Sequence, residues 1–144
     1  MMAALSAFAA DDILERGRYL TYAGGCISCH TEDVEDAIPL AGGRAMETPF
    51  GTFYSPNITP DMKSGIGGWS DDDFLNAFWE GVSPDGKHYF PAFPYTSYTG
   101  ASRDDLLAIK AYLFSLEPVP KETADHDLAW YMSSRIAAGA WKAV

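Results

Sequence analysis

The sequence predicts an all-α domain whose helices are joined by unusually long loops and followed by an extra helix at the C-terminus. Apolar residues recur at helical spacing in residues 13–20 and again in residues 106–116. Residues 31–70 and 83–95 are punctuated by Gly, Pro and Asn and show no helical periodicity. At 144 residues without an internal repeat, the chain fits one domain with a core of its own.

The first expected helix covers residues 13–20, and Asp11 and Asp12 are placed to cap its first turn. Gly17 lies on the apolar face of this helix, where it lowers helical propensity. We therefore expect this helix to cross another one closely at Gly17, because glycine lets two backbones approach.

Capping residues indicate two later helices. Ser70, followed by three aspartates, predicts a helix that Gly81 ends, and Ser102 predicts a longer helix that ends before Pro118. The aromatic tail from Leu128 to Val144 predicts a last helix, which either packs across the domain or forms a docking surface.

Residues 1–10 are small and apolar, and Ala7-Phe8-Ala9 matches the small-x-small cleavage site of a secretory signal. A basic segment is missing, so we interpret these residues as the remnant of an export signal or, alternatively, as a disordered end. Residues 11–120 then form the main domain, and residues 121–144 form an extension that packs on this domain or on a partner. No stretch approaches the roughly 20 apolar residues of a membrane span.

The most informative motif is Cys-Ile-Ser-Cys-His at residues 26–30, because Cys-x-x-Cys-His is the attachment motif of a c-type haem. Cys26 and Cys29 are spaced to bond the vinyl-derived carbons of one porphyrin. His30 then lies beneath the ring, where a neutral imidazole nitrogen reaches the iron as proximal ligand. Both cysteines of the chain are in this motif, so it predicts one covalent haem c and no disulfide.

Two other uses of Cys-x-x-Cys fit less well. A redox disulfide of the thioredoxin type needs a strand-helix alternation, which does not surround Cys26. A structural zinc site needs about four ligands, and only His88 and His126 remain outside the motif. No catalytic nucleophile with a base and no phosphate-binding glycine pattern is found either.

Acidic residues outnumber basic ones by 20 to 10, which gives a formal net charge of −10. This charge opposes binding to nucleic acid or to an anionic membrane surface. It is either ordinary solvated surface or the complement of a basic docking patch on a redox partner.

With the haem motif, several short phrases resemble class I c-type cytochromes, and most closely the haem domains in cytochrome subunits of periplasmic alcohol, gluconate and aldehyde dehydrogenases. These phrases span about residues 11–120. They are Gly-Arg-Tyr-Leu at 17–20, Thr-Pro-Phe-Gly-Thr at 48–52, Asn-Ile-Thr-Pro-Asp at 57–61, Gly-Ile-Gly-Gly-Trp-Ser at 65–70, Gly-Val-Ser-Pro-Asp-Gly at 81–86 and Pro-Ala-Phe-Pro-Tyr at 91–95.

The resemblance implies a cytochrome c fold in which Gly17 meets the C-terminal helix near Tyr112. It also implies that Tyr54 and Trp69 lie near the haem propionates, and a phenol and an indole N–H are suitable donors to carboxylates. The loop that contains Phe93 and Pro94 is expected to lie against the haem plane, since its prolines exclude a helix.

The implied function is one-electron transfer from a periplasmic dehydrogenase to a downstream oxidase or cytochrome, by a carrier that is not itself an enzyme. The chain is expected in the periplasm, either free or attached to the membrane through a partner. Two alternatives stay open: a haem protein with an open iron that binds small gases or acts as a weak peroxidase, and a structural haem subunit of a larger redox complex.

One departure from the family concerns the distal side of the iron. Cytochromes of this class place a methionine before the C-terminal helix, but here Phe93 and Ala101 occupy the two places where this branch carries it. We therefore expect no strong protein ligand opposite His30. The remaining candidates are Met46, Met62, Met132 and His88.

Overall fold

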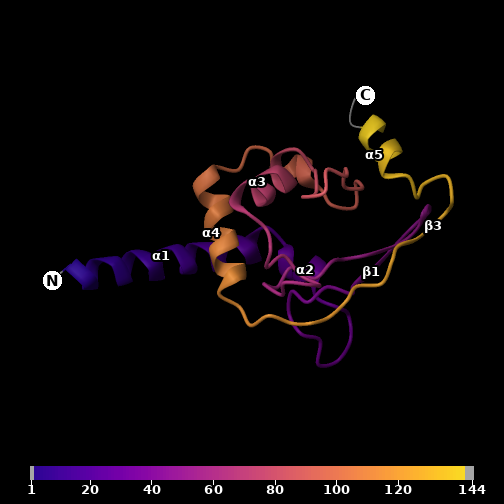
Figure 1. The fold of residues 1–144 in the computed structure, drawn as a ribbon. Coiled ribbons are helices and arrows are strands. Elements are labelled where there is room, and N and C mark those ends of the chain that lie inside the picture. The colour runs from indigo at the N-terminus through magenta and orange to yellow at the C-terminus, as the bar shows by residue number, and fades with distance from the viewer. Residues whose placement is uncertain (1, 142–144) are drawn as a thin grey trace.

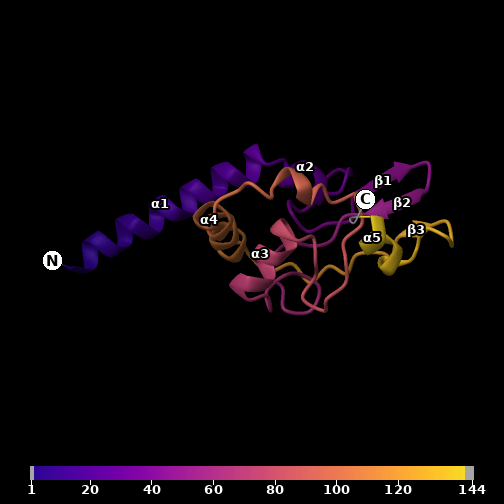
Figure 2. The same cartoon turned by 90° about the horizontal axis from the view of Figure 1, so that it is seen from above.

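The computed structural model describes residues 2–141 and places most of the helices at one end, and a small sheet together with the C-terminal helix at the other (Figures 1 and 2). In chain order the elements are α1 (Met2–Ala23), α2 (Cys26–His30), β1 (Ala45–Thr48), β2 (Gly51–Tyr54), α3 (Asp71–Trp79), the 3-10 turn η1 (Tyr95–Ser97), α4 (Arg103–Phe114), β3 (Asp127–Leu128) and α5 (Arg135–Trp141).

Helices α1 and α4 cross at Gly17, as the sequence predicts. A Cβ on Gly17 would collide with the carbonyl oxygen of Ala108 and would lie 2.9 Å from the Cβ of Tyr112. The expected contact near Tyr112 is therefore confirmed. Beside the crossing, Arg16 Nε donates to Asp105 Oδ1 at 2.6 Å, which ties the two helices together at the surface.

The predicted caps of α3 and α4 are confirmed. The Ser70 hydroxyl accepts from the Asp73 amide, and the Asp73 carboxylate accepts from the Ser70 amide, which forms a capping box. The Ser102 hydroxyl accepts from the amide of Asp105 at 3.1 Å. These contacts satisfy amides that the first helical turn leaves without partners.

The main hydrophobic core lies where α3, α4 and the loop before α3 meet. Its buried members are Leu40, Ile66, Phe74, Leu75, Leu106, Ile109 and Leu113. Cys26 and Ile27 of α2 pack against this cluster, and so do Ile58 and Trp69 from the loop. The core therefore carries the Cys-x-x-Cys-His motif on its edge.

The expectation of an all-α fold is wrong, because β1, β2 and β3 form a three-stranded antiparallel sheet. Gly51 adopts φ 121°, a conformation open to glycine, and this lets the chain reverse after Thr48. Met46 then lies opposite Phe53 on one face of the hairpin. The segment expected to be irregular loop therefore contains a short hairpin.

The helix boundaries at the two ends also differ from the prediction. Helix α1 begins at Met2, so Asp11 and Asp12 lie within it and do not cap it. Within residues 128–141 the tail is helical only in α5, since Leu128 belongs to β3 and pairs with Gly51, and the last three residues of the predicted helix lie outside the described residues. Ala138 of α5 is buried beside Phe53 and Phe90. Over the described residues, none of the helices combines the length and the apolar character that crossing a membrane requires.

Candidate haem site

The Cys-x-x-Cys-His motif forms the short helix α2, directly after α1. Gly25 has φ 76° and turns the chain between the two helices. Cys26 and Cys29 are three residues apart on one helix, which places both thiols on the same side. Cys26 is partly buried against the core and Cys29 is exposed, and neither forms a disulfide.

His30 is oriented by a backbone carbonyl. Its Nδ1 lies 2.8 Å from the carbonyl oxygen of Pro56, which accepts hydrogen bonds and cannot donate them. Nδ1 therefore carries the proton, and Nε2 keeps the lone pair that a metal needs. Burial lowers the pKa of His30, while the bond to Pro56 opposes this shift. The neutral imidazole that results is the ligating form.

The environment of Cys26 is unfavourable for the two other uses of this motif. Burial raises the pKa of the Cys26 thiol to about 11, with a smaller contribution from Cys29. Redox disulfides and zinc sites depend on thiolates stabilised near neutral pH, which this environment opposes. Among the described residues, no three His, Cys, Asp or Glu side chains converge on a point where they could hold a metal ion.

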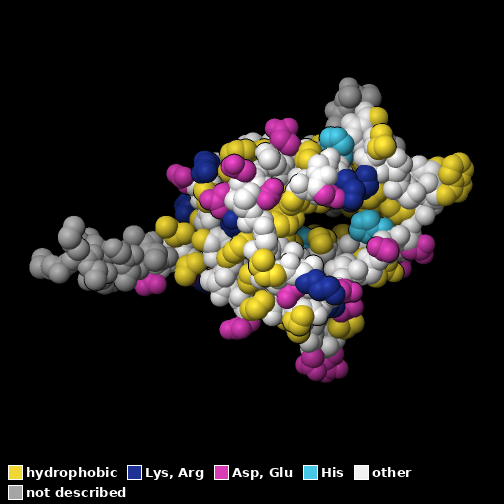
Figure 3. All heavy atoms as spheres, viewed as in Figure 1, with side chains coloured by type: hydrophobic (Ala, Val, Ile, Leu, Met, Phe, Trp, Pro, Cys, Tyr) yellow, Lys and Arg dark blue, Asp and Glu magenta, His cyan; other side chains and the backbone are white. Residues whose placement is uncertain are grey.

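A hollow lined by hydrophobic side chains opens between α3 with the loops that follow it and α2 with the sheet (Figure 3). Aromatic rings form a connected wall on the side of α3. The Phe93 ring lies 5.5 Å from Phe78, 5.5 Å from Tyr89 and 6.2 Å from Tyr98, centroid to centroid. The Tyr98 hydroxyl donates to the carbonyl of Gly24 at 2.7 Å, next to the motif. The structure thus brings the predicted Phe93 loop close to the attachment helix.

The other predicted cofactor contacts lie in separate parts of the chain. Trp69 packs against the same core cluster as Cys26, and Tyr54 is at the end of β2. Neither the Trp69 indole N–H nor the Tyr54 hydroxyl has a hydrogen-bond partner within residues 2–141, so both are free to donate to a ligand. Pro94 is exposed and precedes the turn η1.

Two candidate distal methionines lie in surroundings that do not favour ligation. Met62 is 75% exposed, and Met46 packs against the Phe53 and Phe90 cluster near the sheet. Ala101 instead packs against the main core, as Cys26 does. The resemblance expects a methionine either here or at position 93, and position 101 holds a methyl group instead.

The two remaining candidates are tied to the C-terminal part of the chain. The Met132 amide donates to the Ala129 carbonyl at 2.8 Å, in the turn between β3 and α5. The His88 carbonyl accepts from Arg135 Nε, and a Cβ on Gly139 of α5 would collide with the His88 ring. Both contacts join these residues to the extension and not to α2.

Three contributors to the site were not found from the sequence. Pro56 acts through its backbone carbonyl, for which no residue pattern gives a signal. Tyr98 could have been suspected from its place among the aromatic residues that follow Phe93. His126 accepts from the Tyr54 amide at 3.1 Å, a contact between residues 72 positions apart.

These residues fit a covalently held haem: two thiols on one helix, an imidazole with Nε2 available, a hollow lined by apolar side chains and two unpartnered donors. A haem protein with this attachment motif and helical core is a c-type cytochrome. The family model of cytochrome c matches residues 14–117, more than half of the chain, and the chain belongs to this family.

Three curated relatives show how the domain is used elsewhere. The chain is 47% identical over 131 residues to a nicotinate dehydrogenase subunit of Pseudomonas putida, covering 91% of the chain and 11% of that protein. It is 44% identical to a diheme cytochrome c-type protein of Cereibacter sphaeroides, covering 88% of the chain and 44% of the relative. It is also 44% identical to the gluconate 2-dehydrogenase cytochrome c subunit of Pantoea cypripedii, covering 93% and 30%. The chain therefore spans less than half of the length of each.

Proposed function

We propose that this chain is a monohaem electron-transfer domain. Cys26 and Cys29 hold one haem c by thioether bonds, and His30 is its proximal iron ligand. The main support is the hydrogen bond from His30 Nδ1 to the Pro56 carbonyl oxygen. It leaves Nε2 free to bind the iron, on the same short helix as both thiols. A count of one haem follows from the two cysteines of the chain.

The haem would supply reversible one-electron exchange between Fe(III) and Fe(II). The chain would hold it and exclude water from it. Phe93 and Pro94 cover the ring, while Tyr54 and Trp69 donate to the propionates, which is supported by their free phenol and indole groups. None of these side chains is assigned a chemical step, so the domain acts as a carrier and not as an enzyme.

The electron donor proposed is a dehydrogenase, and the acceptor is an oxidase or a further cytochrome. The names of the relatives support this donor, since they include a nicotinate dehydrogenase subunit and the gluconate 2-dehydrogenase cytochrome c subunit. They favour electron transfer over gas sensing, peroxidase activity or a purely structural haem. The periplasm is the proposed location, because the chain resembles the haem domains in cytochrome subunits of periplasmic dehydrogenases.

We also propose that the distal side of the iron has no strong protein ligand and admits water or an external ligand. This is supported by Phe93 and Ala101 at the two places of the family methionine. The exposure of Met62 and the packing of Met46 in a separate cluster argue in the same direction.

The attachment is tested by mass spectrometry of the chain produced in a host that matures c-type cytochromes. We expect the mass of one haem to remain after denaturation, and the Cys26→Ser/Cys29→Ser variant to lose it. A chain without bound haem would end the proposal.

The function is tested by stopped-flow reduction of the haem protein with dehydrogenases that oxidise hydroxy acids, alcohols or N-heteroaromatic acids. We expect at least one of them to reduce it within a turnover time. If none does so, the proposed donor class is wrong even where the haem is present.

A further inference from the structure

Asn57 is the most fully bonded buried side chain near the site. Only 2% of its surface is exposed. Its Nδ2 donates to the carbonyl oxygens of Val119 at 2.7 Å and Lys121 at 3.2 Å, with Ser64 Oγ further away at 3.3 Å. Its Oδ1 accepts from the amide and the hydroxyl of Thr59 at 2.9 and 2.7 Å. Removal of this amide would therefore leave several buried polar groups without partners.

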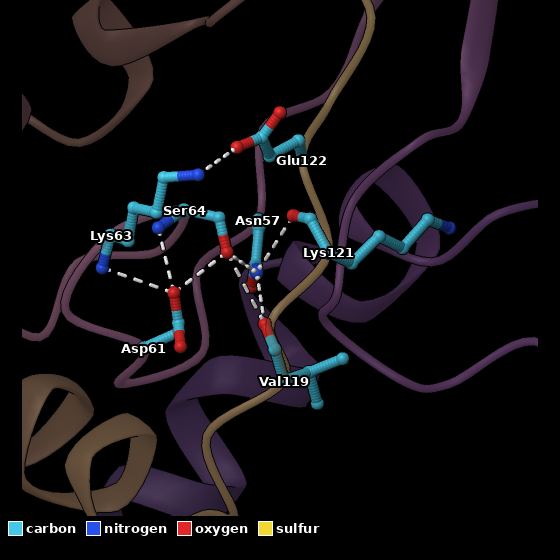
Figure 4. A network of polar contacts seen from close by, with 7 residues as sticks. All are labelled: Asn57, Asp61, Lys63, Ser64, Val119, Lys121 and Glu122. Carbon is cyan, nitrogen blue, oxygen red and sulfur yellow. Dashed lines mark hydrogen bonds and ion pairs between the residues drawn. The ribbon is translucent and has the colours of Figure 1, made fainter.

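The two carbonyls belong to the strap, residues 119–122, which follows α4 and lies beside the Asn57 loop (Figure 4). The strap has a second attachment through the Lys121 side chain. Its Nζ donates to the Glu32 carboxylate at 2.5 Å and to the carbonyl of Gly42 at 3.2 Å. The strap therefore joins the Asn57 loop to the segment that follows the haem motif.

Gly42 contacts both His30 and Pro56. Its amide donates to the His30 carbonyl at 2.8 Å. A Cβ on Gly42 would lie 2.5 Å from the Pro56 carbonyl carbon and 2.7 Å from its oxygen. The Pro56 carbonyl is thus held between Gly42 on one side and the anchored Asn57, its neighbour in the chain, on the other.

We infer that Asn57 is a positioning residue for the proximal histidine. By fixing the Pro56–Asn57 peptide to the strap, it holds the Pro56 carbonyl at hydrogen-bonding distance from His30 Nδ1. The inference rests on the proposed role of His30 as iron ligand. The hydrogen bonds of the Asn57 side chain go to Thr59, Ser64 and the strap and not to His30, so Asn57 acts on the histidine through the backbone.

The hydrogen bond to Pro56 increases the basicity of the imidazole, and such outer contacts tune the metal that a histidine binds. A more basic ligand stabilises Fe(III) relative to Fe(II). When the Pro56 carbonyl moves away, the reduction potential should therefore rise. The Nδ1 proton should also exchange with solvent about tenfold faster, the change that corresponds to the loss of one hydrogen bond's net stabilisation.

The experiment compares the haem-bound Asn57→Ala and Lys121→Met variants with the unmodified protein. Reduction potentials are measured by spectroelectrochemistry, and exchange of the His30 Nδ1 proton by NMR. In both variants the reduction potential should rise and the Nδ1 proton should exchange faster, with the larger effect in Asn57→Ala. Lys121→Met keeps Asn57 and its bonds, so it remains informative if Asn57→Ala does not fold.

Two control variants separate positioning from general stability. Leu113→Ala removes a buried core side chain, and Lys63→Gln removes the surface pair with Glu122, a strap contact that bypasses Asn57. Neither control should change the potential. The inference would be overturned if Leu113→Ala shifted the reduction potential as much as Asn57→Ala does. It would also be overturned if neither Asn57→Ala nor Lys121→Met changed the potential or the exchange rate. If the unmodified haem protein shows no ligated His30, the proposed function itself fails.

Discussion

Ala101 occupies one of the two places where the resemblance expects the distal methionine, so under the proposed function its side chain affects the properties of the iron. Its amide donates to the Tyr98 carbonyl at 2.9 Å, and its carbonyl accepts from the Trp79 indole at 3.1 Å. The backbone at this position is therefore fixed, and the methyl group packs against the same core as Cys26. Under the proposed function, a longer side chain with a thioether at this position would supply the ligand that alanine lacks.

We predict that Ala101→Met restores a methionine ligand. The reduction potential should rise, because a thioether ligand favours Fe(II), and cyanide should bind much more weakly. The oxidised absorption spectrum should gain a methionine-to-iron charge-transfer band. Thr99→Met, at an exposed neighbouring position, should show neither change. If the unmodified protein already shows this band, a methionine occupies the site and the proposed open iron is wrong.

Among the secondary-structure elements, α1 and α4 depend most directly on one sequence feature. Inside a helix, glycine is less stabilising than alanine by about 1 kcal/mol, so local helical propensity does not explain Gly17. The crossing explains this choice, since the carbonyl of Ala108 occupies the space of a Cβ.

We predict that Gly17→Ala destabilises the haem protein by about 2 kcal/mol, because overpacking outweighs the gain in helical propensity. Urea denaturation followed at the haem band measures this loss. Gly100→Ala is the matched control, because a Cβ there meets no atom within 4 Å. It should leave the stability unchanged or raise it slightly. A neutral Gly17→Ala would mean that the two helices separate at low cost.

The attachment of the C-terminal extension to the sheet should depend on pH through His126. Its Nδ1 accepts from the Tyr54 amide, and its ring lies 5.3 Å from Phe53 and 5.7 Å from Phe90. Burial lowers the pKa of His126, Arg135 lowers it further and Asp125 opposes the shift. The folded state thus favours the neutral ring. Stability from this contact is present above the ordinary pKa of histidine and is lost as the pH falls below about 6.5.

We predict that the protection factor of the Tyr54 amide against hydrogen exchange decreases between pH 7 and pH 5. His126→Gln, whose side-chain oxygen can accept without titrating, should remove this pH dependence. A protection factor that stays constant in the unmodified protein would show that the proton does not break the contact.

The sequence is informative about elements that depend on local chemistry and less so about those that depend on distant partners. The caps at Ser70 and Ser102 and the crossing at Gly17 are encoded within a few residues, and the structure confirms them. The sheet was missed because β1 and β2 are four residues each and β3 has two, which is too short for an alternating pattern. The Pro56 carbonyl escaped notice for another reason, since any residue supplies a carbonyl.

On the scale of the whole molecule, the haem motif lies between two differently built parts. The helices α1, α3 and α4 share the main core, while the sheet and α5 surround the smaller cluster of Phe53, Phe90 and Ala138. The hollow opens between them (Figure 3). We expect the net charge of the molecule to influence how a charged redox partner approaches it.

The formal net charge of −10 predicts how the haem exchanges electrons with small charged reagents. Oxidation of the reduced protein by tris(phenanthroline)cobalt(III), a cation, should slow about tenfold between low and physiological salt, because screening removes the attraction. Oxidation by ferricyanide, an anion, should accelerate over the same range. Stopped-flow traces at several ionic strengths measure both slopes. The Asp33→Asn/Glu35→Gln/Asp36→Asn variant, with a net charge of −7, should reduce both, since these three acids are exposed. Equal slopes for the two reagents would show that a locally balanced surface around the haem, and not the net charge, governs the encounter.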